Sequence, residues 1–267
     1  MSISSVVIVG AGQAGFQVAA SLRQGGYTGA ITLIGDEPGL PYQRPPLSKA
    51  YLLGKIKADN LAFRPATFFS EQNIELLHTR AVEIDRQNQN VVLANGNSVD
   101  YDHLILATGG HNRLLSIPGD DVEGVYGIKT LADADALSPR MSAASNVVVV
   151  GCGFIGLEFA AVAAELGKSV QLVDRGDRLM ARAISHEMSA LFLNAHQSWG
   201  VKFHFNQGVS RITHANGKVT GVVKENGEEL PADLVVYGIG IIPNITLAAE
   251  AGLEIDNGIK VDANLLT

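Results

Sequence analysis

The chain has 267 residues, of which 46% are hydrophobic and 18% charged, and its formal net charge is −7. This composition supports a large buried core and excludes an intrinsically disordered chain. The acidic balance, without any basic block, argues against nucleic-acid binding. Cys152 is the only cysteine, and the first residues, Met1–Ser5, lack the basic start of a secretory signal. Both features predict a protein of the reducing cytoplasm.

The first half of the chain begins with a strand, a glycine-rich turn and a helix. The apolar run Ser5–Val9 predicts a buried strand, and Gly-Ala-Gly-Gln-Ala-Gly follows at residues 10–15. A helix is predicted at Gln13–Gln24 and a second strand at Ala30–Gly35, before a proline-rich loop over residues 36–47. Asn95-Gly96 then predicts a hairpin between strands at Asn90–Leu93 and Ser98–Tyr101. A strand at Leu104–Ala107 ends at Thr108-Gly109-Gly110.

The second half repeats this order. After a helix at Leu131–Met141, a strand at Asn146–Val150 leads into Gly-Cys-Gly-Phe-Ile-Gly at residues 151–156. A helix at Phe154–Leu166, a strand at Ser169–Val173 and a helix at His186–Trp199 follow. Short strands with turns at residues 216–217 and 226–227 come next, and a strand at Leu234–Tyr237 runs into Gly238-Ile239-Gly240. The apolar stretch 148–166 contains glycines and two glutamates, so it is interpreted as a strand and a helix, not a membrane span.

This duplication predicts an α/β protein with two Rossmann-like dinucleotide-binding domains, in the architecture of glutathione reductase. The first domain is expected at residues 1–112, completed by 240–267, and the second at 113–239. In a G-x-G-x-x-G turn after a buried strand, the glycines let the backbone approach a pyrophosphate, and the helix N-terminus attracts it. One such motif can be a purely structural turn, whereas two suggest two dinucleotides. The candidate pyrophosphate ligands are Gly10, Gly12, Gly15, Gly151, Gly153 and Gly156.

An aspartate follows each glycine turn by about 20 residues, at the tip of the next strand. These residues are Asp36 and Asp174. A carboxylate at this position accepts hydrogen bonds from a ribose 2′-hydroxyl and repels a 2′-phosphate, so Asp174 favours NAD over NADP. Arg175 stands beside it and could attract a phosphate, so the predicted preference is moderate. The alternative is that both aspartates only cap the ends of their strands.

The proline-rich loop carries two cations on a stiff backbone. Pro41, Pro45 and Pro46 restrict the segment that holds Arg44 and Lys49, close to where cofactor phosphates are expected. A solvated loop is the simpler alternative. With this loop, both glycine turns, residues 117–119 and residues 232–244, the chain resembles the FAD-dependent, NADH-consuming ferredoxin and rubredoxin reductases that serve oxygenases. It is more distantly similar to apoptosis-inducing factor.

The resemblance implies a set of site residues. The FAD site would comprise the first glycine turn with Ala14, together with Asp36, Arg44, Lys49, Val82, Thr108, Gly109 and Lys129. The NADH site would comprise the second turn with Ile155, together with Asp174, Gly238, Ile239 and Gly240. Lys49 and Glu158 would be the catalytic pair beside the flavin. The alternative for Glu158 is a carboxylate that only favours the dipole of its helix.

The function that the resemblance implies is electron transfer from NADH through FAD to a ferredoxin or rubredoxin. A redox-gated NADH-binding protein like apoptosis-inducing factor is the alternative. Cys152 lies inside a glycine turn and has no cysteine partner, which argues against disulfide reduction. The seven histidines lack ligand spacing, so no metal site is expected, and neither nucleic acid nor membrane is an expected partner. Relatives in this family carry a C-terminal domain that this chain is expected to lack.

Overall fold

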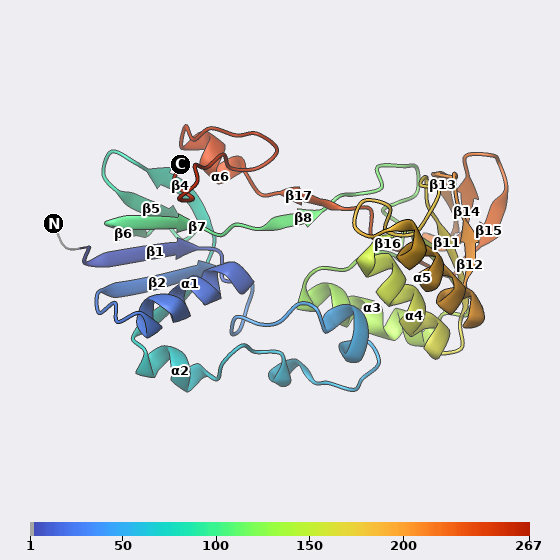
Figure 1. The fold of residues 1–267 in the computed structure, drawn as a ribbon, viewed down its shortest axis with the longest axis horizontal. Helices are drawn as coiled ribbons and strands as arrows, with labels where there is room; N and C mark the ends of the chain where they lie inside the picture. Colours follow the sequence, from blue (N-terminus) through green and yellow to red (C-terminus); the bar gives the residue numbers. More distant parts are fainter. Residues whose placement is uncertain (1–2) are drawn as a thin grey trace. The chain divides into compact units, whose positions relative to one another are not determined.

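The computed structural model describes residues 3–267, and Figure 1 labels its strands and helices where there is room. Met1 and Ser2, which entered the argument about the start of the chain, lie outside the described residues. The chain forms two compact units. The first comprises the chain up to residue 43 with residues 59–111 and 242–267, and the second comprises residues 44–58 and 112–241.

The first unit is built on the parallel sheet β3-β2-β1-β7. Its strands are β1 (Ser5–Val9), β2 (Ala30–Gly35), β3 (Ile74–His78) and β7 (His103–Leu106). Alternate residues of β1 face opposite sides. Val6 and Ile8 join a cluster with residues of α1 (Gln13–Gln24) and α2 (Ala66–Glu71). Val7 and Val9 join a cluster with Val91, in the antiparallel sheet of β4 (Ala81–Asp85), β5 (Asn90–Leu93) and β6 (Ser98–Asp100).

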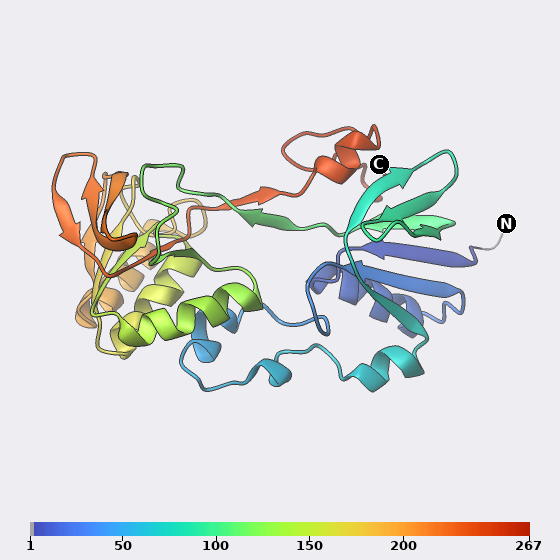
Figure 2. The ribbon, with the colours of Figure 1, turned by 180° about the vertical axis from the view of Figure 1, so that it is seen from behind.

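The second unit has the same three layers as the first, which are helices, a parallel sheet and a small antiparallel sheet. Its parallel sheet has the order β12-β11-β10-β16-β9. Figure 2 shows the ribbon from behind. The strands are β9 (Val125–Gly127), β10 (Asn146–Val150), β11 (Ser169–Val173), β12 (Lys202–His204) and β16 (Leu234–Tyr237). The helices are α3 (Leu131–Ala143), α4 (Phe154–Glu165) and α5 (His186–Ser198).

An antiparallel sheet covers the other face of this parallel sheet. It consists of β13 (Val209–Ala215), β14 (Lys218–Lys224) and β15 (Glu229–Pro231). Val148 and Val150 of β10 belong to one buried cluster with Ile212 and Val222 of this sheet. Both units therefore consist of helices, a parallel sheet and a small antiparallel sheet, and the predicted pair of Rossmann-like folds is confirmed.

Short elements complete the chain. They are the helical turns η1 (Leu47–Tyr51) and η2 (Ala58–Asn60), the helix α6 (Thr246–Glu250), and the strands β8 (Gly110–Asn112) and β17 (Ile241–Pro243), which pair with each other. In the part of the chain that is described, no helix has the length and apolar character needed to cross a bilayer.

The expected domain bounds, residues 1–112 with 240–267 and residues 113–239, stay a prediction. Within the two compact units, residues 44–58 group with the second unit. The physical reason is a set of polar contacts with α3 and α4. Lys49 Nζ lies 2.9 Å from Glu158 Oε1, Lys55 Nζ lies 2.7 Å from Glu165 Oε1, and the Tyr51 hydroxyl donates to the Asp135 carboxylate.

Candidate functional site

The first glycine turn closes against the end of β7. Gly10 has φ +112°, and a Cβ at this position would lie 2.0 Å from the carbonyl oxygen of Ala107. A Cβ at Gly15 would lie 1.8 Å from the Gly10 carbonyl oxygen, so α1 can start here only with glycine. At Gly12, by contrast, no described atom beyond the adjoining residues lies within 4 Å of an added Cβ. The N-terminus of α1 is therefore open on the side of Gly12, as a bound pyrophosphate requires.

The second glycine turn has the same geometry. Gly151 has φ +106°, and its Cβ would lie 2.6 Å from the Gly238 carbonyl oxygen. A Cβ at Gly156 would lie 2.0 Å from the Gly151 carbonyl oxygen. Around Gly153 the nearest described atom is 3.8 Å from an added Cβ, so the start of α4 is open as well. In each turn, two glycines are needed by the fold and the middle glycine keeps space for a ligand.

The two strand-tip aspartates have different surroundings. Asp36 follows β2, is exposed, and lies 3.8 Å from Arg80 Nε. Asp174 follows β11, and its carboxylate accepts hydrogen bonds of 2.6 Å from the N–H groups of Cys152 and Gly176. A carboxylate has about four acceptor positions, so two remain for a ribose diol. These contacts also agree with the alternative that Asp174 fixes the end of its strand, and its ribose role stays a prediction.

A cavity of about 890 Å³ lies in the second unit. The cavity is lined by most of the site residues that were predicted for the second half of the chain. The loop residues that were expected at the FAD line it as well. These lining residues are Arg44, Lys49, Lys129, Gly151, Gly153, Ile155, Glu158, Asp174, Gly238, Ile239 and Gly240. A volume of this size lies within the range of small-molecule and cofactor sites. Gly156 packs beneath the turn and is not among the described residues that line the cavity.

Several lining residues were not predicted, among them Arg182, Gln207 and Gly208. They lie on the connections that follow β11 and β12, where no sequence motif marks them. Within the described chain, Gln207 Oε1 is buried without a hydrogen-bond partner. A buried acceptor of this kind normally has a donor, so this end of the cavity is suited to a polar ligand.

The predicted pair Lys49 and Glu158 is brought together. Lys49 Nζ lies 2.9 Å from Glu158 Oε1, and the Ser48 hydroxyl donates to Glu158 Oε2 over 2.5 Å. Both charged side chains are partly exposed, at 45% for Lys49 and 29% for Glu158. The Arg44 guanidinium donates to the Lys129 carbonyl over 3.0 Å. Arg44, Lys49 and Lys129 belong to the second unit, and the FAD contacts that the resemblance implies for them stay a prediction.

The other predicted residues lie in the first unit. Ala14 is exposed in the first turn of α1. Val82 lies where the pairing of β4 with β5 changes register, and it is 43% exposed. Thr108 and Gly109 follow β7, and the Thr108 hydroxyl donates to the Asn244 carbonyl over 2.7 Å. Asn244 returns a hydrogen bond to the Thr108 carbonyl over 2.9 Å, so it fixes this loop, a role that sequence reasoning missed.

Cys152 is buried inside the second glycine turn. Burial and then the nearby Asp174 carboxylate raise the pKa of its thiol well above the ordinary value. The thiolate, which is the reactive form, is therefore scarce at neutral pH. Across residues 3–267, no group of three or more His, Cys, Asp or Glu side chains is placed to hold a metal ion.

Comparisons with known proteins agree with this geometry. Residues 4–267 match the family described as pyridine nucleotide-disulphide oxidoreductase. The chain belongs to this family. Rhodocoxin reductase of Rhodococcus erythropolis is 50% identical over 98% of this chain and 62% of its own length. Rubredoxin-NAD(+) reductase of Pseudomonas putida is 39% identical over 98% of this chain and 69% of its own length.

Solved structures point to the same oxidoreductases. The ferredoxin reductase for the CYP199A2 system from Rhodopseudomonas palustris has a TM-score of 0.94 and 48% identity, covering 96% of this chain and 63% of that one. The reductase of a covalent putidaredoxin reductase–putidaredoxin complex has a TM-score of 0.93 and 41% identity, covering 97% and 64%. The resemblance to ferredoxin and rubredoxin reductases is confirmed. The chain spans 62–64% of the length of the first three curated relatives it matches.

Proposed function

We propose that this chain is part of a flavoprotein oxidoreductase that passes electrons from NADH through FAD to a ferredoxin or rubredoxin serving an oxygenase. The observation that carries the proposal is the duplicated glycine turn, whose middle glycine leaves the helix N-terminus open in each unit. In the first unit, Gly10–Gly15 and Asp36 are suited to FAD. In the second, the cavity with Gly153 and Asp174 is suited to NADH.

Bound together, the two cofactors would supply hydride transfer followed by release of single electrons. The protein's own contribution is to bind and orient. The helix N-termini face the pyrophosphates, and the aspartates offer acceptors to the ribose hydroxyls. Lys49 and Glu158 remain our candidates for the residues that act on the flavin's charge. The cytoplasmic location also stays a prediction from the sequence.

The alternative, an interaction protein resembling apoptosis-inducing factor, receives no support from the relatives named above, which are reductases. Disulfide reduction, which the family's name includes, is disfavoured for this chain. Its one cysteine is buried beside a carboxylate, and that environment keeps the thiol protonated.

The test is anaerobic reduction of the purified protein. Protein reconstituted with FAD should retain a flavin spectrum through gel filtration and lose it on addition of NADH, and it should then reduce a ferredoxin or rubredoxin. NADPH is expected to act more weakly, because Asp174 repels a 2′-phosphate. Colourless protein that binds neither FAD nor NADH would refute the proposal.

A further inference from the structure

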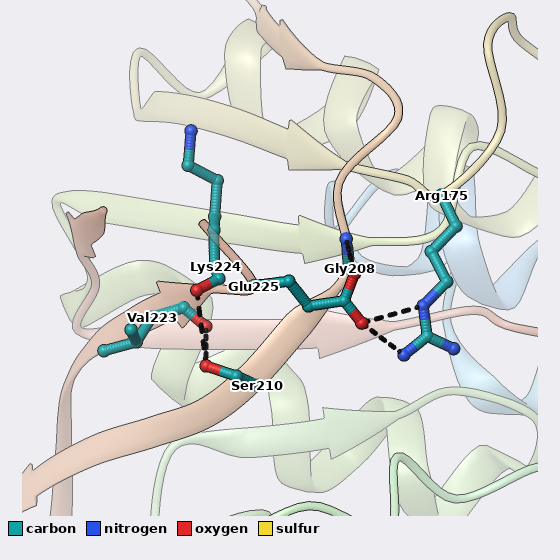
Figure 3. Close-up of polar contacts among 6 residues, drawn as sticks. All are labelled: Arg175, Gly208, Ser210, Val223, Lys224 and Glu225. Atoms are coloured by element: carbon teal, nitrogen blue, oxygen red, sulfur yellow. Dashed lines mark hydrogen bonds and ion pairs between the residues drawn. The ribbon is translucent and has the colours of Figure 1, made fainter. Parts of the chain in front are cut away.

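An ion pair lies at the edge of the cavity of the second unit. Arg175 directly follows Asp174, and its Nη2 and Nε atoms lie 2.7 and 3.2 Å from Glu225 Oε1 (Figure 3). The other oxygen, Glu225 Oε2, accepts a hydrogen bond of 3.1 Å from the Gly208 N–H. Both carboxylate oxygens therefore have partners, and Arg175 uses two of its donors on one of them while its side chain stays 75% exposed.

Gly208 allows this arrangement. A Cβ at position 208 would lie 2.4 Å from Glu225 Oε1 and 2.6 Å from Arg175 Nε, so the ion pair rests directly on the glycine backbone. The Glu225 N–H also donates to the Gly208 carbonyl over 2.9 Å. Residue 208 is thus joined to Glu225 by backbone and side chain, and any larger residue there would displace the pair.

The neighbouring β-bulge fixes the position from which the Glu225 side chain leaves the backbone. The pairing of β13 with β14 shifts register between Val209 and Arg211. At the shift, the Ser210 hydroxyl donates to the carbonyls of Val223 and Lys224, over 3.0 and 3.3 Å (Figure 3). The Lys224 side chain points away from Glu225 in the same view, and its ammonium pairs with Glu228 at 2.8 Å. Arg175 is therefore the cation that Glu225 binds.

An arginine beside the strand-tip acid is the residue type that accommodates a 2′-phosphate in dinucleotide folds. Arg175 lines the cavity, whereas Glu225 is not among the described residues that do so. The guanidinium and the Gly208 N–H hold the pKa of Glu225 below its ordinary value, so this carboxylate is ionised at neutral pH. Glu225 consequently occupies the fork of Arg175 and offsets its charge whenever the pair is closed.

We propose that Glu225 is a specificity-determining residue, which holds Arg175 in the ion pair and so withholds it from a 2′-phosphate. This inference rests on the proposed function, because it concerns the pyridine nucleotide of that same cavity. It assigns the preference for NADH to two acids instead of one. Asp174 faces the ribose, and Glu225 acts through Arg175 as a positioning residue.

The experiment measures dissociation constants of NAD⁺ and NADP⁺ by calorimetry for the purified protein and four variants. These are Glu225→Ala, Arg175→Ala, the double variant, and Glu123→Ala as the control. Glu123 also pairs with an arginine, Arg140, so the control removes the same charge and the same kind of contact. Each glutamate side chain is at least 37% exposed, so the variants are expected to fold.

In Glu225→Ala the affinity for NADP⁺ should rise about threefold, since the exposed ion pair is weak and its removal frees guanidinium donors for the phosphate. The affinity for NAD⁺ should change less than about twofold, because NAD⁺ has a hydroxyl where NADP⁺ carries the 2′-phosphate that Arg175 would contact. The gain should shrink with added salt, and it should grow as the pH rises through about 6, where a phosphate monoester takes its second charge. In the Arg175→Ala background the same substitution should have no effect, and the control should behave as the unaltered protein.

Two results would overturn the inference. One is an unchanged NADP⁺ affinity in Glu225→Ala while NAD⁺ still binds, which leaves the proposed function intact. The other is an equal gain with and without Arg175, which would mean that Glu225 acts on the phosphate by its own charge. If the unaltered protein bound neither nucleotide, the proposed function would be refuted, and the inference with it.

Discussion

Gly153 and Gly156 provide a matched pair of substitutions that separates ligand space from packing space. Gly153 has φ −76° and ψ −178°, an extended conformation that alanine also adopts. The nearest described atom lies 3.8 Å from the added Cβ. At Gly156 the added Cβ lies 2.0 Å from the Gly151 carbonyl oxygen and 3.4 Å from Val149 Cγ1. Gly153→Ala therefore makes only an ordinary van der Waals contact, and Gly156→Ala clashes with backbone.

The structure sets the expected magnitudes. A carbon and a carbonyl oxygen normally approach no closer than about 3.3 Å, so Gly156→Ala must move the turn or the helix by roughly 1.3 Å. Close-packed interiors resist such shifts, and overpacking typically costs about 1–3 kcal/mol, so a loss near the upper end, about 3 kcal/mol, is expected. Gly153→Ala should instead stabilise by about 0.4–1 kcal/mol, through a less flexible unfolded chain.

Urea unfolding followed by tryptophan fluorescence measures both effects. Trp199 is the only tryptophan, and it caps the C-terminus of α5 in the same unit. NAD⁺ binding is measured in parallel. Gly153→Ala should keep its fold and lose at least about tenfold in affinity, since its methyl group occupies the approach to the helix N-terminus. Equal loss of stability in both variants, or unaltered NAD⁺ affinity in Gly153→Ala, would refute this reasoning.

Three further predictions concern single side chains. Lys49→Ala should slow the reduction of bound flavin by NADH by about tenfold or more. The control Lys55→Ala, which breaks the pair with Glu165, should not slow it. Equal rates for the two variants in stopped-flow traces would remove Lys49 from the mechanism. Burial and then the Lys224 charge lower the pKa of His204, so the unfolded chain takes up this proton first and stability falls as the pH drops below about 6.5. In urea unfolding, the free energy of unfolding of His204→Gln should depend less on pH than that of the unaltered protein. An unchanged slope would contradict the lowered pKa of His204. Cys152 should resist a thiol reagent at pH 8 in native protein and react once urea unfolds the chain; rapid labelling of the native protein would show that the thiol is accessible.

The sequence predicted the elements whose signals are local. Three elements have the predicted bounds, namely the strands Ser5–Val9 and Asn146–Val150 and the helix Gln13–Gln24. An apolar run next to a glycine turn can be recognised from a few neighbouring residues. The helix α2 and the strands β3 and β4 were not predicted, since residues 66–85 lack strong periodicity and their turn at Asn73 is not a two-residue hairpin signal. Short elements of this kind depend on neighbours that are remote in the chain.

The assignment of residues 44–58 to the second unit was not predictable from local signals. It depends on contacts between residues far apart in the chain, with 84 positions between Tyr51 and Asp135 and 110 between Ser48 and Glu158. The same limit applies to the site. Asp174 follows from its spacing to the turn, whereas Gly208 and Glu225 belong to no motif and become visible only when β13 and β14 pair.

The two units show why similar turns do not make equivalent sites. Both turns leave the middle glycine open, so each fixes where a pyrophosphate is expected. The strand-tip acids differ, because Asp36 is exposed whereas Asp174 is held by two N–H groups. An acceptor that is already oriented loses less conformational entropy on binding, so the second site is the one better able to discriminate among nucleotides. In our proposal that discrimination extends to Arg175 and its partner Glu225, which directly follows β14. On this proposal the glycine turn specifies that a dinucleotide binds, and the residues at the ends of later strands specify which one.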